Sequence, residues 1–150
     1  MALGIVANFP WEMAHSLLYR GATKWTMGRH LLCGGLAALT DGAGIAVIFG
    51  FGIVVFRDAR WTRLRSLARL GFTALLGLAG AILNEWLALR LDWWGYGPTM
   101  PRVPGANLGI TPLIQFMAMP LGVLFWALPL CWHYPERRRR SDDLEDTRPA

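Results

Sequence analysis

The chain has 150 residues, which is enough for one domain. Its residues are 54% hydrophobic and only 17% charged, against a usual charged share of about 25% in soluble domains. The formal net charge is +5, but the basic residues flank apolar segments instead of forming a stripe. This pattern excludes a soluble core and a nucleic-acid partner, and it predicts an all-α integral membrane protein.

Four segments are expected to span the membrane as helices, because a bilayer core of about 30 Å takes about 20 helical residues. They are residues 3–19, 31–56, 67–91 and 108–132. The first is the shortest, and Pro10 is expected to kink it. Arginine clusters follow the second and fourth segments, so the positive-inside rule places both termini in the cytoplasm. We therefore predict a polytopic four-transmembrane-helix bundle in the plasma (inner) membrane.

The four segments form one predicted transmembrane domain, residues 1–135. The remaining residues, 136–150, hold five arginines and five acidic residues with almost no apolar side chains. They are expected to form a disordered cytoplasmic tail, since they cannot bury enough apolar surface to fold. The outer loop, residues 93–111, instead mixes prolines and glycines with aromatic residues, which is typical of a fixed cap.

The first and last predicted helices carry polar faces at helical spacing. On the first helix, the polar positions spaced by four, three and four residues are Asn8, Glu12, His15 and Tyr19. On the last, the polar positions spaced by four residues are Asn107, Thr111 and Gln115. Polar faces inside a bilayer are expected to meet one another, a cavity or a ligand.

Carboxyl groups are also expected inside the bilayer. Glu85 follows Gly77 and Ala81 on one face of the third helix, a small-residue face that predicts close packing against another helix. Asp41 lies near the middle of the second helix. One ionised carboxylate at the bilayer centre costs about 3 kcal/mol on insertion scales. These costs favour a shared polar pocket that opens to the outer half of the membrane.

This pocket contains the candidate site residues. The groups that could exchange protons, and are therefore the candidate catalytic residues, are Glu12, His15 and Glu85. The candidate substrate-binding residues, which the topology places in or near the same pocket, are Asn8, Tyr19, His30, Asn84, Trp86, Tyr96, Thr111 and Gln115. Asp41 is interpreted as a buried structural residue that bonds Thr40 or neighbouring backbone.

Plainer interpretations of these residues remain open. Glu12 and His15 lie one turn apart and can pair with each other. His30 lies near the interface, where water can solvate it. Asn84 and Gln115 can form hydrogen bonds that hold helices together, and the tryptophans can anchor the protein at the membrane interface.

A metal site is the less favoured interpretation. Carboxylates and imidazoles suit zinc or non-haem iron, and the candidate ligands are Glu12, His15, Glu85 and His30. Only Glu12 and His15 share a helix face, and the Glu-x-x-His pattern of di-iron bundles has no second copy in this sequence. We therefore favour acid–base pairing and predict no cofactor.

Several short patterns carry a resemblance over most of residues 1–132. They are Trp11-Glu12-x-x-His15 with Leu18-Tyr19, Glu85-Trp86, Trp94-x-Tyr96, Met100-Pro101 and Pro112-x-x-Gln115. The chain resembles small uncharacterised bacterial four-helix integral membrane proteins, a grouping that implies no particular activity. It is also loosely similar to membrane isomerases of the emopamil-binding type, which use His and Glu inside a helical bundle.

The leading hypothesis is a membrane protein that binds or transforms a hydrophobic, lipid- or isoprenoid-like molecule. As an enzyme it would be an acid–base isomerase or cyclase, because a buried carboxylic acid can keep its proton at neutral pH and donate it. One alternative is a non-catalytic accessory or assembly subunit of a membrane complex, and a second is a metal-binding membrane protein. The expected partners are the bilayer, the hydrophobic ligand, and a membrane protein partner or further copies of the chain.

Overall fold

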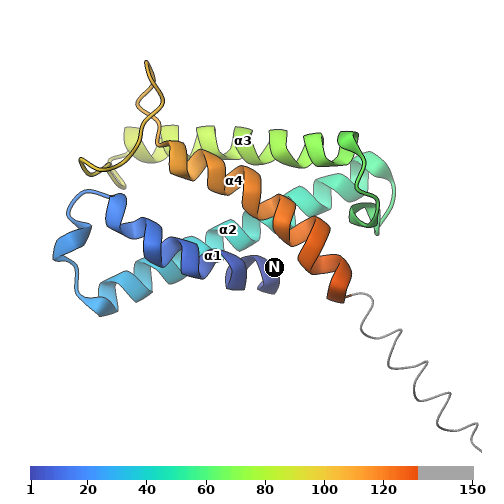
Figure 1. The fold of residues 1–150 in the computed structure, drawn as a ribbon, viewed down its shortest axis with the longest axis horizontal. Helices are drawn as coiled ribbons and strands as arrows, with labels where there is room; N and C mark the ends of the chain where they lie inside the picture. Colours follow the sequence, from blue (N-terminus) through green and yellow to red (C-terminus); the bar gives the residue numbers. More distant parts are fainter. Residues whose placement is uncertain (132–150) are drawn as a thin grey trace, which may run out of the picture.

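A computed structural model describes residues 1–131, and this part of the chain is all-helical, as predicted (Figure 1). Its α-helices are α1 (Ala2–His15), α2 (Met27–Phe56), α3 (Leu67–Arg90) and α4 (Ile110–Gly122). A π-helical turn, η4 (Val123–Ala127), continues α4, and 3-10 turns form η1 (Ser16–Leu18), η2 (Ala22–Lys24) and η3 (Trp61–Arg63). The predicted tail, residues 136–150, lies outside the described residues.

Three helices in the described part are long and apolar enough to cross a membrane: α2, α3 and the helix formed by Ile110–Cys131. The expected first span, residues 3–19, is not among them. Helix α1 has 14 residues, or about 21 Å at 1.5 Å per residue, which is less than a bilayer core of about 30 Å. It stops at His15 because the chain tightens into η1 and then becomes extended at Tyr19.

Side-chain caps determine where α2 and α3 begin. The Thr26 hydroxyl accepts a hydrogen bond from the Arg29 backbone N–H at 3.3 Å, so α2 starts four residues before the expected position 31. The Ser66 hydroxyl accepts one from the Arg69 backbone N–H at 3.4 Å and caps α3 in the same way. Helix α2 ends where Arg57 takes a left-handed conformation, with φ of 50°.

The helices form two pairs, α1 against α2 and α3 against α4 (Figure 1). Both pairs approach closely through glycines. A Cβ added at Gly4 would lie 3.0 Å from the Cα of Gly42, and one added at Gly77 would lie 2.0 Å from the backbone oxygen of Phe116. In Figure 1, α2 and α3 converge at the connection that holds η3 and diverge toward their other ends. Small residues therefore bring the backbones together, as expected for packing in lipid.

The exterior of the described part is apolar and its interior contains polar groups. Large side chains such as Val54, Leu67 and Leu75 are exposed. Asn8 and Glu85, by contrast, are 1% and 2% exposed. A soluble domain distributes its residues the other way, so this arrangement fits a lipid surrounding.

The end of the molecule near η3 is a dense aromatic cluster, which we name the aromatic end. Its buried centre is Trp61, whose indole N–H donates to the backbone oxygen of Phe49 at 3.1 Å. The aromatic rings packed around Trp61 belong to Phe49, Phe56, Phe72 and Phe125. The Arg69 guanidinium donates to the Trp61 backbone oxygen and lies 3.8 Å from the Asp58 carboxylate, which ties η3 to α3.

Candidate functional site

The opposite end, which we name the polar end, holds a cavity of about 710 Å³, the polar cavity. It lies where α2 and α3 have diverged, between η1, α4 and the loop that follows α3. Four acidic residues line it, namely Glu12, Asp41, Glu85 and the exposed Asp92, together with the exposed Arg20 and Arg29. Its aromatic side chains belong to Tyr19, Trp25, Trp93, Trp94 and Phe116. Asn84 and Gln115 add amide groups. The cavity thus combines four acidic and two basic residues with five aromatic side chains.

Gln115 is the hydrogen-bonding centre of this cavity. Its amide nitrogen lies 2.8 Å from an Asp41 carboxyl oxygen and 3.2 Å from the Asn8 amide oxygen, and it also donates to Glu12. The Asn8 amide nitrogen donates to the Gly4 backbone oxygen at 2.8 Å, which turns the Asn8 oxygen toward Gln115. One side chain on α4 therefore joins α1 and α2.

Glu85 is held by the loop that follows α3. The Tyr96 hydroxyl donates a hydrogen bond to the Glu85 carboxylate and accepts one from the Gly109 backbone N–H at 2.8 Å. Burial, followed by the hydrogen bond to Glu85, raises the pKa of Tyr96 above its ordinary 10.0, so this phenol remains a donor at neutral pH.

The same loop is joined to the turn after α1. The Arg20 N–H donates to the Gly95 oxygen at 2.8 Å and the Gly97 N–H donates to the Leu18 oxygen at 2.7 Å. The exposed Arg20 and Asp92 side chains add an ion pair at 3.1 Å, which contributes little because water screens it. The loop therefore closes over the polar end as a cap.

His15 and His30 are held by hydroxyl groups outside the lining of the polar cavity. The His15 Nε2 lies 2.7 Å from the Thr111 hydroxyl, which itself donates to the Met100 sulfur. His30 Nδ1 lies 3.0 Å from the Ser16 hydroxyl, and Ser16 does line the cavity. The pairing of Glu12 with His15, left open from the sequence, is not observed, since Glu12 bonds to α2 and α4 instead.

Trp86 and Asp41 differ from their sequence-based interpretation. Trp86 is half exposed, lies under the Arg90 guanidinium and is not among the lining residues, so it faces away from the cavity. Asp41 does not bond Thr40, whose hydroxyl donates to the Ala37 backbone oxygen in its own helix. Instead the Asp41 carboxyl bonds Gln115 and Glu12 across the cavity. In the sequence, the available signal for this orientation was that Asp41 shares a helix face with Ala37, four residues earlier, which lines the same cavity.

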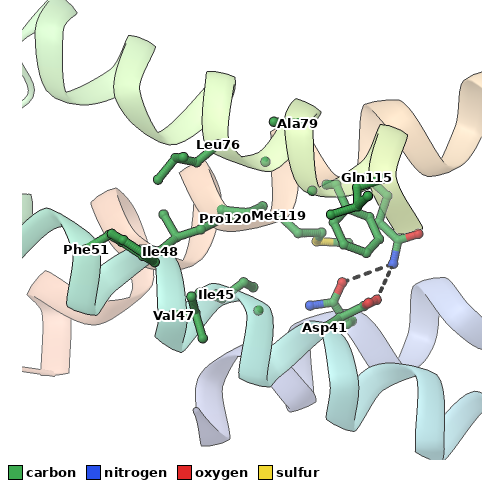
Figure 2. A pocket seen from close by; sticks show the side chains of 16 residues that line it. Asp41, Ile45, Val47, Ile48, Phe51, Leu76, Ala79, Gln115, Met119 and Pro120 are labelled. Atoms are coloured by element: carbon green, nitrogen blue, oxygen red, sulfur yellow. Dashed lines mark hydrogen bonds between the residues drawn. The ribbon is translucent and has the colours of Figure 1, made fainter. Parts of the chain in front are cut away.

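A second cavity of about 340 Å³ continues from the first between α2, α3 and α4, and we name it the apolar groove (Figure 2). Its side chains come mainly from Ile45, Ile48, Phe51, Leu76 and Met119. Figure 2 shows the Gln115 amide bonded to Asp41 at one end of this groove. The two cavities share three residues, namely Asp41, Gln115 and Phe116. The groove therefore extends the polar cavity into an apolar region.

The four expected metal ligands do not converge. Within residues 1–131 no three His, Cys, Asp or Glu side chains lie close enough together to hold a metal ion. Glu12 accepts a hydrogen bond from Gln115, whereas Glu85 accepts one from Tyr96. Each of the two histidines is hydrogen-bonded to a hydroxyl group instead.

Comparison with known proteins gives no match: no family model, no curated protein and no solved structure is similar to this chain. The function therefore has to be argued from the two cavities and their side chains.

Proposed function

We propose that the protein binds an elongated hydrophobic molecule with one polar end, of lipid or isoprenoid type, in its two joined cavities. One observation carries this proposal. The polar cavity and the apolar groove meet at Asp41 and Gln115, so a single ligand could place its polar end among carboxyl and aromatic groups and its chain between α2 and α3. Volumes of about 340 and 710 Å³ fall within the usual range of small-molecule sites, about 300–1,000 Å³.

The groove also supports a route of entry from the membrane. Val47, Phe51 and Leu83 line it, yet their side chains are largely exposed on the outside of the helices. An apolar chain dissolved in lipid could therefore move sideways between α2 and α3 without crossing water. This favours a membrane-soluble ligand over a water-soluble one.

The proposed topology is a four-helix bundle with both termini in the cytoplasm and the polar cavity in the outer half of the plasma membrane. The arginines that follow α2 lie beside the aromatic end, and the positive-inside rule assigns that end to the cytoplasm. In this arrangement α1 is a short fourth helix that enters the bilayer only partly and packs on α2.

The proposed chemistry is acid–base isomerisation or cyclisation of the bound molecule. A carboxyl group surrounded by apolar and aromatic side chains can keep its proton at neutral pH and donate it to a bound alkene. Glu12 and Glu85 both line the polar cavity and are the proposed acids, while His15, one helical turn from Glu12, is held by its hydrogen bond to Thr111.

The experiment combines mass spectrometry with a variant that fills the groove. Gly80 lines the groove and has open space at its Cβ position, so Gly80→Phe would fill it. Gly50 also has open space but lies outside the lining, and Gly50→Phe is the matched control. We expect an apolar molecule to be retained after gentle detergent extraction by the unaltered chain and by Gly50→Phe, and lost from Gly80→Phe. A stoichiometric membrane partner with no retained small molecule would contradict the proposal and support the accessory-subunit alternative.

A further inference from the structure

The hydrogen bonds around Gln115 are one donor short. Its amide nitrogen has two hydrogens, but three acceptor oxygens lie within bonding distance, on Asn8, Glu12 and Asp41. The amide nitrogen of Asn8 is already committed to the Gly4 backbone oxygen. A further proton is therefore needed among these oxygens, and the Glu12 and Asp41 carboxyls, which bond each other, are the groups that can hold it.

Charge leads to the same requirement. Within residues 1–131 no ion pair to either carboxyl is observed. Of the two arginines that line the polar cavity, Arg20 pairs with Asp92 and Arg29 lies over the Trp25 ring, and both are exposed. Two carboxylates in contact cannot both be ionised when no cation compensates them, and they share a proton instead. We propose that Glu12 and Asp41 are one proton-sharing carboxyl pair, oriented by Gln115, and that this pair is the proton store of the site.

The pair lies where its proton would be useful. Asp41 and Gln115 border both cavities, so the shared proton is located where the apolar chain of a ligand would meet the polar cavity. The remaining titratable groups that interact with the pair are Glu85 on α3 and the phenol of Tyr19, and His15 lies on the same helix as Glu12. The facing groups are acidic, so they oppose complete ionisation of the pair.

The role of the pair as an acid rests on the proposed function. The O–H bond of the pair would break while the π electrons of a ligand double bond form a C–H bond, which leaves a positive charge on the neighbouring carbon. A C–H bond next to that carbon then returns its proton to the carboxylate, and its electrons form the shifted double bond. Atoms and electrons balance without an oxidant or a second substrate, and Asp41 acts through Glu12 as a positioning residue.

Infrared spectroscopy of the full chain in lipid nanodiscs tests the pair without any ligand. Between acid and alkaline pH we expect the protonated-carboxyl band of the pair to lose intensity in two steps, one proton in each, separated by more than about one pH unit, because interacting acids titrate as a pair. Glu12→Gln and Asp41→Asn should each change the same band and leave a single step. The matched control, Asp58→Asn, alters a partly exposed aspartate at the aromatic end, outside both cavities, and should leave the band unchanged.

Three outcomes would overturn the inference. They are a band that only one of the two substitutions changes, a band that neither changes, and a single-step titration of the unaltered chain. The last measurement needs no variant, so it decides the question even where a substitution prevents folding. A shared band in a protein that retains no apolar molecule would leave the pair in place and remove the proposed function, so the two failures are distinguishable.

Discussion

The two ends of this molecule are built on different principles. At the aromatic end, Trp61 fills the space between α2, α3 and η4 so closely that a Cβ added at Gly52 would lie 2.1 Å from its ring. At the polar end the same helices diverge, and side chains from α1, α3, α4 and the cap enclose about 710 Å³. Shape and dispersion hold the first end, whereas hydrogen bonds across an open space hold the second.

This difference separates stability from function within a short chain. Close packing at the aromatic end fixes the helices relative to one another, which lets the polar end tolerate a cavity with buried carboxyls. Substitutions at the two ends should therefore differ in kind: those at the aromatic end should change stability, and those at the polar end should change the bound molecule and the titration behaviour.

Removing the central indole should have the largest effect. Trp61→Ala deletes a fully buried ring and the hydrogen bond to Phe49, and we expect a loss of about 3–5 kcal/mol in unfolding free energy. Trp86→Ala, which removes a half-exposed ring, is the control and should cost far less. Unfolding in mixed detergent micelles, followed by circular dichroism, measures both. Equal losses would show that the aromatic end is not the stabilising one.

The second-largest effect should come from a substitution at the close contact between α3 and α4. The Cβ of Gly77→Ala would meet the Phe116 backbone oxygen, which cannot move like a side chain, so we expect a cost of about 1–3 kcal/mol. Gly80→Ala, on the same helix with open space at its Cβ, is the control. Thermal unfolding in detergent compares the two, and an unchanged Tm for Gly77→Ala would contradict the close approach of these helices.

Glu85 provides a sharper test of the polar end. Glu85→Gln keeps the shape and can still accept from the Tyr96 hydroxyl, so it should fold with a loss of less than about 1 kcal/mol. Glu85→Leu leaves the Tyr96 hydroxyl without its acceptor, and we expect a loss of about 1–3 kcal/mol. Detergent unfolding of the pair of variants measures the difference, and a more stable Glu85→Leu protein would show that burial outweighs this hydrogen bond.

Alkaline pH should reveal the contribution of the Tyr96 hydrogen bonds to stability, with a smaller effect. Because burial and Glu85 raise the pKa of Tyr96 in the folded protein above 10.0, its contribution to stability is complete below pH 10. It declines as the pH rises above 10, where the unfolded chain releases the phenolic proton and the folded one does not. Stability from pH 8 to 11 in the unaltered chain and in Tyr96→Phe measures it. Parallel curves would mean that Tyr96 titrates normally.

The sequence was sufficient for the helices and for several buried faces. Apolar length alone predicts α2 and α3, and the small-residue spacing that leads to Glu85 correctly predicts a buried position, 2% exposed. The sequence was not sufficient for α1. Residues 3–19 contain enough apolar side chains to predict one helix, but the helix ends at His15. Apolar composition does not register the local change from α-helix to 3-10 turn.

The partners of each polar group were decided only by the tertiary structure. Sequence spacing placed Glu12 beside His15. In the structure, the relative rotation of α1, α2 and α4 instead brings Glu12 to Gln115 and Asp41. His15 is hydrogen-bonded to Thr111. Helical periodicity determines which residues share a face, because it is a property of one helix. Which faces meet depends on the glycine contacts and on the loop that brings Tyr96 to Glu85, and these join positions far apart in the chain.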